Sequence, residues 1–320
     1  SKSNIYVLRG IFSIFASVNL IIGVLFDKKY DYVFIYSPPL LYGFVGILLK
    51  FFKGSKIALN VQDLFPQNAI DLGILKNKYA IKFFKLVERF FYDTFDLVTF
   101  HSGGNLKQAQ DSHGDKKRNK YVMHNWINFN EEIKNNGKTS QYVIGKSTIV
   151  YAGVVGPSQI DGLISFLVSF SELDSQKFHL LIHGEGTALD RLKKKVEDLS
   201  LHNVEIKDFI PEAEYMDLLK KVDIGLVALS KNVKTPVVPG KILGYMKNSL
   251  PVFAVANIDN DVHEIIKEAK NGVSSDHNIS NKLKLFSNMD FKEMGSNGYI
   301  YAKKHYDINK IIGKFLDVFL

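Results

Sequence analysis

Residues 178–209, FHLLIHGEGTALDRLKKKVEDLSLHNVEIKDF, decide the fold that we expect for this chain. Two short apolar runs, at 178–184 and 203–209, enclose the amphipathic segment 187–200. A strand, a helix and a second strand at this spacing are typical of a parallel sheet with right-handed crossover connections. The stretch therefore predicts an α/β unit with neighbouring parallel strands.

The same alternation extends in both directions along the chain. Further apolar, β-branched runs predict strands at 30–37, 56–62, 97–102, 120–125, 147–153, 223–229 and 250–256, and helical patterns stand at 76–95, 212–221 and 297–320. The polar stretch 127–147, rich in Asn and Gly, separates two halves. We expect an α/β protein with two Rossmann-like domains, at 1–135 and 145–300, that face a cleft. A C-terminal helix at 301–320 is expected to pack back on the first domain.

The composition narrows the possible partners and chemistries. The 320 residues suffice for two domains, and the absence of cysteine excludes disulfides, thiolate catalysis and Cys-ligated metal. A net charge of +8 points to an anionic partner, and nucleic acid, a membrane surface and phosphorylated substrates all fit. The basic residues are scattered along predicted helices, without the aromatic interleaving of a nucleic-acid groove. This pattern favours anionic lipid and phosphorylated compounds.

Two long apolar runs stand near the N-terminus, at 11–26 and 40–52. A membrane-spanning helix needs about 20 apolar residues, and the first run has 16 uncharged ones while the second contains Lys50. The first run also ends without the small-residue cleavage site of an export signal. We expect buried or interfacial helices here, with a membrane-dipping helix or an export signal as alternatives.

The stretch KTPVVPGKILGYM, residues 234–246, places two prolines and a glycine before a predicted helix that starts at Lys241. A cation in the first turn opposes the helix dipole unless an anion binds there. Free amides, Lys241 and the close backbone approach that Gly240 allows would suit a diphosphate. The alternative is a Pro-rich turn before a buried helix with a snorkelling lysine.

Glycines follow two of the predicted strands. Gly153 and Gly156 come after the strand at 147–153, and Gly184 and Gly186 stand before the helix at 187–200. Backbone amides at such turns can face a phosphate or a nucleotide, although each turn alone is also a plain connection. At the end of the strand 203–209, the backbone of Phe209–Ile210 is a candidate for reading a base edge, or simply a turn before a helix.

A second candidate site stands at VQDLFPQNAIDLG, residues 61–73, where Asp63 follows a strand and Gln67 and Asn68 come shortly after. Asp63 is placed to orient or deprotonate a substrate hydroxyl. Its alternative role is an N-cap for the helix after Pro66. His101, at the end of the strand 97–102, is a second candidate base or a histidine satisfied by the backbone.

The acidic pair in Asp259-Asn260-Asp261 resembles a metal-binding motif. However, Asp261 and Glu264 have the spacing of a capping box at the start of a helix. We therefore expect a helix cap and no essential metal.

These motifs resemble one family in their joint order. YAGVVGPSQ (151–159), HGEG (183–186), the stretch 203–229, TPVVPGKILGYMKNSLPVFA (235–254) and EIIKEAKNGV (264–273) are similar to family 4 glycosyltransferases of the GT-B fold. They are especially similar to the bacterial branch that builds O-antigen, capsule and colanic-acid-type polysaccharides. Residues 37–77 resemble the N-terminal domain of the same branch, around an SPP turn and the stretch VQDLFP.

The resemblance implies retaining, metal-independent transfer from a nucleotide-diphosphate sugar to a polyprenyl-diphosphate-linked oligosaccharide. The expected donor is a UDP-sugar, with an N-acetylated hexosamine or a deoxyhexosamine as the candidate sugars. The expected place is the cytoplasmic face of the bacterial membrane, which the chain would contact peripherally. The implied catalytic residues are Lys241, Asp63 and His101, and the acceptor side has Asp63, Gln67 and Asn68. The implied donor-binding residues are Gly153, Gly156, Gly184, Glu185, Phe209, Ile210, Val238, Pro239, Gly240, Lys241 and Ile242.

The chain departs from the family pattern in three places. It lacks the first strand–helix units of the N-terminal domain, so we expect a fragment, a naturally short form, or a chain that borrows the missing part from a partner chain. Val154 and Gln159 stand where the family often has Arg and Lys, and Gly244 stands where many members have the Glu that holds the donor ribose. Two alternatives therefore stay open: a donor-binding or non-catalytic subunit, and a GT-B sugar-nucleotide epimerase.

Overall fold

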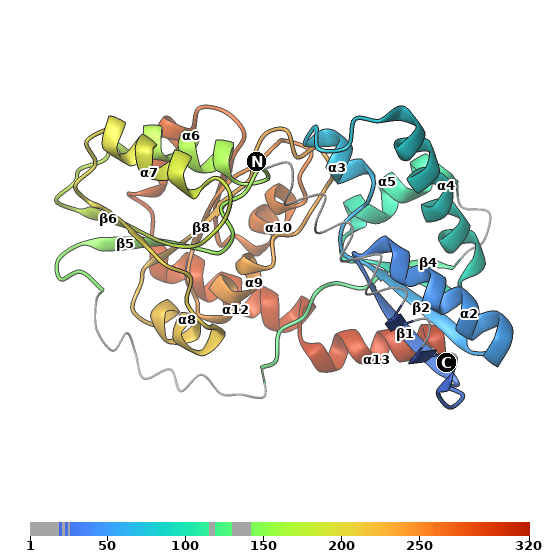
Figure 1. Ribbon diagram of the computed structural model, residues 1–320. Coiled ribbons are helices and arrows are strands. Elements are labelled where there is room, and N and C mark those ends of the chain that lie inside the picture. Colours follow the sequence, from blue (N-terminus) through green and yellow to red (C-terminus); the bar gives the residue numbers. More distant parts are fainter. Residues whose placement is uncertain (1–18, 21–22, 25, 115–118, 130–141) are drawn as a thin grey trace. The chain divides into compact units, whose positions relative to one another are not determined.

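Parallel strands with intervening helices make up both halves of the chain, as the sequence predicts. In this computed structural model the described residues are 19–20, 23–24, 26–114, 119–129 and 142–320, and they divide into two units (Figure 1). Unit 1 holds those before Asn125 together with 235–237 and 313–320, and unit 2 holds those of 125–234 and 238–312. Most of the apolar run 11–26 lies outside the described residues, so its expected structure stays a prediction.

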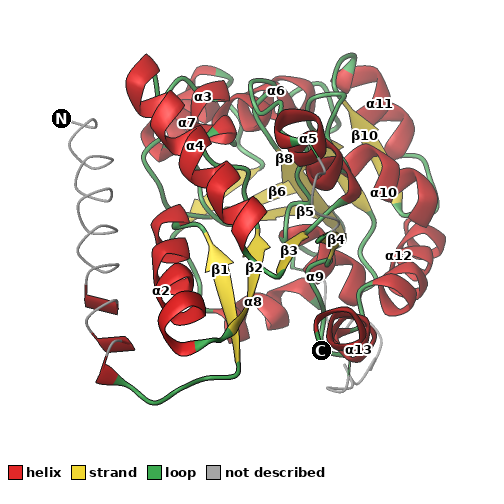
Figure 2. Cartoon of the chain, turned by 90° about the vertical axis from the view of Figure 1, so that its right-hand side faces the viewer, coloured by secondary structure: helices red, strands yellow, loops and turns green. Residues whose placement is uncertain are grey.

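Unit 1 is built on a four-stranded parallel sheet in the order β1-β2-β3-β4 (Figure 2). One face carries apolar residues of α2 and α4 against Ile57 and Leu59, and on the other face Phe315 and Phe319 pack near Ala58. The elements are β1 (Tyr32–Ser37), η1 (Leu40–Tyr42), α2 (Gly43–Lys53), β2 (Lys56–Val61), α3 (Gln67–Asp71), α4 (Lys78–Thr94), β3 (Leu97–Phe100), α5 (Gly103–His113) and β4 (Lys120–Val122).

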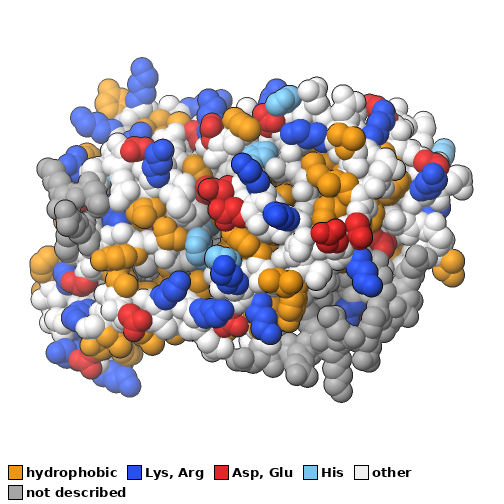
Figure 3. Space-filling view, turned by 180° about the vertical axis from the view of Figure 1, so that it is seen from behind, with side chains coloured by type: hydrophobic (Ala, Val, Ile, Leu, Met, Phe, Trp, Pro, Cys, Tyr) orange, Lys and Arg blue, Asp and Glu red, His pale blue; other side chains and the backbone are white. Residues whose placement is uncertain are grey.

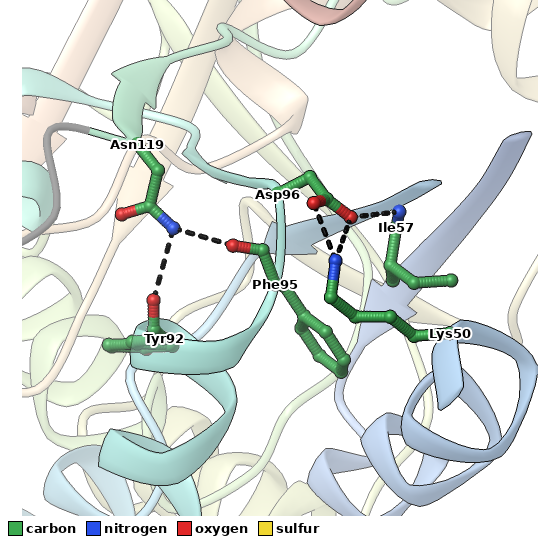
Figure 4. Close-up of polar contacts among 6 residues, drawn as sticks. All are labelled: Lys50, Ile57, Tyr92, Phe95, Asp96 and Asn119. Carbon is green, nitrogen blue, oxygen red and sulfur yellow. Dashed lines mark hydrogen bonds and ion pairs between the residues drawn. The ribbon is translucent and has the colours of Figure 1, made fainter. Parts of the chain in front are cut away.

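Polar contacts fix the carboxyl end of α4 within unit 1 (Figure 4). Asp96, just after the helix, accepts hydrogen bonds from Lys50 of α2 at 2.5 and 2.6 Å and from the main-chain N–H of Ile57 at 2.8 Å. The buried amide of Asn119 donates to the carbonyls of Tyr92, at 3.1 Å, and Phe95, at 2.8 Å. Because these carbonyls end the helix and have no intrahelical donor, the amide satisfies them and anchors α4 beside β4.

Unit 2 has a six-stranded parallel sheet in the order β10-β9-β8-β5-β6-β7. Its strands are β5 (Ser147–Ala152), β6 (Phe178–His183), β7 (Val204–Lys207), β8 (Ile224–Ala228), β9 (Val252–Val255) and β10 (Gly272–Ser275). In chain order, the strands begin in the middle of the sheet with β5, continue to one edge with β6 and β7, and return to the middle with β8. This is the doubly wound order of a Rossmann fold, in which ligands bind beyond the carboxyl ends of the strands where the order reverses, here between β5 and β8.

Helices cover both faces of the second sheet (Figure 1). Apolar residues of α6 and α7 pack on one face, and α8, α9 and α12 lie on the other. The helices of unit 2 are α6 (Ile160–Phe170), α7 (Leu189–Asp198), α8 (Glu212–Leu219), α9 (Lys241–Lys247), α10 (Val262–Ala269), α11 (Ile279–Phe286) and α12 (Phe291–His305). Helix α13 (Ile308–Phe319) begins in unit 2 and ends in unit 1.

All nine predicted strands are confirmed, while three local predictions need correction. The sequence missed β10, because Gly272 and two serines are poor strand formers; a side chain at Gly272 would overlap the carbonyl of Val252 on β9. The expected helix at 297–320 is two helices, α12 and α13. It breaks where Ile127 forms main-chain hydrogen bonds with Tyr306 and Ile308, at 2.7 and 3.0 Å.

The prediction of a capping box at the start of α10 is also wrong. Asp261 precedes the helix but makes no side-chain capping hydrogen bond. Asn260 takes this role, because its side-chain oxygen accepts from the N–H of Val262 at 3.1 Å. None of the helices in the described ranges combines the length and the apolar composition that a membrane crossing requires.

Candidate functional site

Helix α9 is attached to the sheet of unit 2 at the point where its strand order reverses. The buried hydroxyl of Tyr245 lies 3.2 Å from the carbonyl oxygen of Val150 on β5 and 3.1 Å from that of Leu226 on β8. Gly225 on β8 leaves room for the tyrosine ring, which any side chain at this position would overlap. The arrangement fixes the start of α9 beside the position where a Rossmann fold binds ligands.

Lys241, the first residue of α9, points its ammonium group toward the carboxyl end of β5. Its Nζ lies 3.5 Å from the centroid of the buried Tyr151 ring and would be 3.4 Å from a Cβ placed on Gly153. Within the described part of the chain Lys241 forms no ion pair or hydrogen bond, and desolvation lowers its pKa to about 7. The ring face favours the charged form only in part. An anion is the partner that this ammonium lacks.

The N-terminus of α9 offers free amides but only a small dipole. The main-chain N–H groups of Gly240 and Lys241 make no hydrogen bond within the described ranges. The N–H of Ile242 donates to the carbonyl of Pro239 at 3.0 Å, and the side chains of Ile242 and Val238 are buried. Because α9 has only seven residues, the charge of Lys241 matters more here than the helix dipole.

The glycine turns after β5 and β6 pack against each other. Gly153 and Gly186 have φ of 140° and 141°, where side chains are rarely tolerated. A Cβ on Gly184 would lie 2.5 Å from the carbonyl oxygen of Gly153, and one on Gly186 would lie 2.5 Å from that of Val155. These glycines therefore allow two turns to approach closely.

The hydrogen bonds of these turns bear on our expectation that the amides of the glycines face a phosphate. The N–H of Gly153 donates to His183, that of Gly184 donates to Lys207, and that of Gly156 donates to the side chain of Gln159, at 2.9, 3.1 and 3.3 Å. These amides are used inside the protein and do not cradle a phosphate. Their glycines shape the edge of the site instead.

The other predicted donor residues lie at the surface of the same sheet edge. Glu185 and Gly186 are exposed after β6, and Phe209 is exposed and Ile210 half-buried after β7. Parallel strands bring all these turns to one edge together with Gly153 and Lys241. Their contacts with a ligand stay predictions.

The space beside Gly244 is occupied by another side chain. A Cβ on Gly244 would lie 3.2 Å from the hydroxyl oxygen of Tyr215 on α8, which is closer than side chains usually pack. A glutamate would therefore require this tyrosine to move.

Val154 and Gln159 stand where the family often has Arg and Lys. The side chain of Val154 is exposed, and that of Gln159 accepts a hydrogen bond from the N–H of Gly156. Neither places a positive charge at the end of β5, which the ammonium of Lys241 reaches.

Asp63 of unit 1 lies beyond the carboxyl end of β2. Burial raises the pKa of its carboxyl group, and its charge contributes to the raised pKa of Tyr36 on β1, mainly caused by burial. Asp63 does not cap α3, which begins after Pro66 without a side-chain cap. The N-cap alternative for Asp63 is therefore excluded.

His101 lies one residue beyond β3, at the same sheet edge as Asp63. Its side chain is buried, and desolvation lowers its pKa to about 4, against the opposing effect of a backbone hydrogen bond at Val61. The imidazole of His124 lies 3.0 Å from the carbonyl oxygen of His101. At neutral pH His101 is uncharged, and its side chain is almost fully buried whereas that of Asp63 is partly exposed, so Asp63 is the candidate base that an acceptor can reach more easily.

Gln67 and Asn68 are only partly exposed, on helix α3. The amide of Gln67 donates to Asp71 at 2.7 Å, and the residue lines a small cavity of unit 1 with Glu88 and His113. This engages Gln67 within unit 1, and the expected role of Gln67 and Asn68 on the acceptor side stays a prediction. In the described residues no three His, Asp or Glu side chains are grouped to hold a metal ion, and metal independence stays a prediction.

Sequence reasoning missed three residues that build the site: Tyr151, Gly225 and Tyr245. Tyr151 and Tyr245 belong to apolar runs, and in the sequence they look like ordinary core residues. Gly225 gave a signal, because an isolated glycine inside a strand indicates a close approach by another group.

Comparisons with known proteins agree with this architecture. The family described as "Glycosyl transferases group 1" matches residues 131–305, which is more than half of the chain. "Probable glycosyltransferase WbjE" of Pseudomonas aeruginosa is 23% identical over 247 residues, covering 75% of this chain and 61% of that protein. The chain thus spans less than two thirds of this curated relative.

Solved structures resemble the fold at low identity. HepE from Anabaena in complex with UDP has a TM-score of 0.70 at 15% identity, over 93% of this chain and 80% of that one. A mutant of TarM from S. aureus, in complex with Fondaparinux, alpha-GlcNAc-glycerol and UDP, has a TM-score of 0.68 at 18% identity, over 94% of this chain and 59% of that one. The expected α/β fold with two Rossmann-like domains is confirmed, and the chain belongs to the group 1 glycosyl transferases of the GT-B fold.

Proposed function

We propose that this chain is a retaining, metal-independent glycosyltransferase that moves a sugar from a UDP-sugar to a polyprenyl-diphosphate-linked oligosaccharide. Lys241 carries the proposal, because it places a desolvated cation, with no anionic partner in the described part of the chain, where a Rossmann fold binds its ligand. Membership of the family supports sugar transfer as the activity. The expected setting is bacterial surface polysaccharide synthesis on the cytoplasmic face of the membrane.

Lys241 would act on the leaving group. When the bond between the anomeric carbon and the diphosphate oxygen breaks, negative charge builds on the β-phosphate. The ammonium of Lys241 and the free amides of Gly240 and Lys241 would stabilise this charge most strongly when the bond is nearly broken. Because the ammonium is already desolvated and positioned, little reorganisation is required during the reaction.

Asp63 would act on the acceptor, which we assign to unit 1. Its carboxylate would orient the acceptor hydroxyl and take its proton as the oxygen bonds the anomeric carbon, on the face that UDP leaves. Its raised pKa makes it a better base than an exposed aspartate. UDP as the nucleotide is supported by the complexes of HepE and TarM, two structural neighbours, with UDP.

A panel of nucleotide sugars tests the donor assignment. We expect UDP and one or more UDP-sugars to raise the melting temperature of the chain, because a ligand that binds only the folded state stabilises it. GDP- and CMP-sugars serve as controls. If no uridine nucleotide shifts the melting temperature or binds in calorimetry, the proposal of a UDP-sugar donor is wrong.

The affinity for UDP should depend on pH through Lys241. Its pKa is about 7 in the free protein, and a bound diphosphate would raise it, so binding above neutral pH takes up a proton. Between about pH 7.5 and 9.5, where the phosphates stay ionised, we expect the dissociation constant to rise by up to about tenfold per pH unit. Calorimetry in buffers with different ionisation enthalpies measures both the affinity and the proton uptake.

Lys241→Arg is the matched variant for this pH test. Arginine stays protonated throughout the range, so its UDP affinity should be nearly flat with pH. A flat profile in the unaltered protein, with no proton uptake, would contradict the placement of Lys241 at the diphosphate.

A further inference from the structure

Helix α4 carries two ordered rows of side chains on its exposed surface. Tyr79, Phe83, Leu86 and Phe90 form an apolar row with spacings of four, three and four residues. These side chains are 87%, 54%, 59% and 47% exposed. At this spacing they occupy one face of the helix, opposite the face buried in unit 1.

A row of basic residues runs beside the apolar row. Each basic residue precedes an apolar one, and all are exposed: Lys78, Lys82, Lys85 and Arg89. An acidic residue, Asp93, is 3.6 Å from Arg89, and the other acid of the helix, Glu88, is buried against His113. The outer surface of α4 thus has one row of apolar, mostly aromatic, side chains and a neighbouring row of cationic side chains.

The inner face and the carboxyl end of α4 are held in place within unit 1. Val87 and Phe91 fix the inner face of α4 in the core of unit 1, and the contacts of Asp96 and Asn119 anchor its carboxyl end (Figure 4). Helix α2 lies beside α4 (Figure 2). Near its carboxyl end it has two exposed rings, Phe51 and Phe52. Elsewhere, on the face in Figure 3, basic side chains are dispersed among acidic and apolar ones.

This ordering corrects our expectation that basic and aromatic residues are not interleaved. A row of exposed aromatic residues is unfavourable in water unless something covers it. A convex helix with rings along its crest and lysines beside them fits an anionic lipid surface, since the rings enter the interface and the lysines reach the headgroups.

We propose that the outer face of α4 is a membrane-docking surface that binds anionic lipid through the row Tyr79, Phe83, Leu86 and Phe90 and its basic neighbours. The inference rests on the proposed function only in identifying the membrane as the one that contains the lipid-linked acceptor. Docking would hold unit 1 at the surface where that acceptor is found. It would also restrict the search for the acceptor to two dimensions.

Sedimentation with vesicles tests the proposal without donor or acceptor. We expect the protein to bind phosphatidylcholine vesicles that contain phosphatidylglycerol. Lys82→Gln with Lys85→Gln, and separately Phe83→Gln with Phe90→Gln, should each weaken binding by about tenfold or more. Lys193→Gln with Lys194→Gln on α7 makes the same charge change on lysines of unit 2 and should leave binding nearly unchanged.

Two results would overturn the docking surface. One is an absence of vesicle binding by the unaltered protein, and the other is an equal loss in the α7 control, which would mean attraction by net charge alone. Circular dichroism and the melting temperature check that each variant is folded, because the α4 variants lie in unit 1 whereas UDP is assigned to unit 2. UDP binding is measured separately, without vesicles. It separates the two proposals, since a protein that binds UDP but no vesicles would contradict only the docking surface.

A fluorescent label identifies what covers the row. The chain has no cysteine, so Phe83→Cys and, as control, Leu285→Cys on α11 each give one labelling site for an environment-sensitive dye. Anionic vesicles should shift the emission of the label at position 83 to shorter wavelength and leave that at 285 unchanged. A label at 83 that is shielded before vesicles are added would mean that another segment or a second copy covers α4. A shift with single-stranded nucleic acid instead would also refute lipid as the partner.

Discussion

Replacement of Lys241 by alanine is expected to lower the rate of sugar transfer by about 100- to 1000-fold, the usual cost of removing one preorganised group that stabilises developing charge. The loss should fall mainly on kcat, because the charge on the leaving diphosphate is greatest in the transition state. A weaker effect on UDP-sugar affinity is expected, since the free amides of Gly240 and Lys241 remain. Initial rates at saturating UDP-sugar measure the effect.

Folding should not explain this loss. The side chain of Lys241 is half-buried, desolvation lowers the pKa of its ammonium, and it has no acidic partner among the described residues, so its removal should leave the melting temperature unchanged or higher. Lys241→Arg keeps the charge and should recover part of the rate. Lys267→Ala on α10 removes an exposed lysine of unit 2 and serves as the matched control. Full activity in Lys241→Ala would show that the diphosphate site lies elsewhere.

Replacement of Asp63 by asparagine should lower the transfer rate by about 100-fold or more, because the acceptor hydroxyl loses its base. The amide has nearly the same shape and removes only the charge and the proton-accepting ability. Donor binding should be unaffected, since the donor is assigned to unit 2. The measurement is the rate of transfer together with UDP affinity in the same preparation.

Two variants sharpen the test of Asp63. Asp111→Asn on α5 changes an exposed aspartate of the same unit and should be silent. His101→Asn should cost less than Asp63→Asn, because the side chain of His101 is almost fully buried and the proton of the acceptor is assigned to Asp63. A larger loss at His101 than at Asp63 would reverse the two assignments.

The fold was predictable because alternating strands and helices leave a strong pattern. The nine predicted strands are short apolar runs at the expected spacing, and those of unit 2 form the parallel, doubly wound order expected of a Rossmann fold. What the pattern could not predict depends on contacts between distant residues. Strand β10 is formed by pairing with β9, and position 272 is a glycine because the carbonyl of Val252 occupies the space of a side chain. The helix break after His305 lies where Ile127 pairs with this segment.

The site was predictable only in part. Lys241 stands out in the sequence because a cation at a helix start requires an explanation. The sequence could not show that its ammonium lies over Tyr151, or that Tyr245 joins β5 to β8 below it, since both tyrosines look like core residues. The glycines were recognised for the wrong reason: three of their amides donate within the protein.

The most direct test is a proton NMR time course with a UDP-sugar that binds the chain and a polyprenyl-diphosphate-linked acceptor. We predict that UDP is released only when the acceptor is present, and that the new glycosidic bond has the anomeric configuration of the donor. A purified chain active alone would also exclude a non-catalytic subunit. Conversion of the UDP-sugar without acceptor would indicate an epimerase, and a product of inverted configuration would contradict retaining transfer.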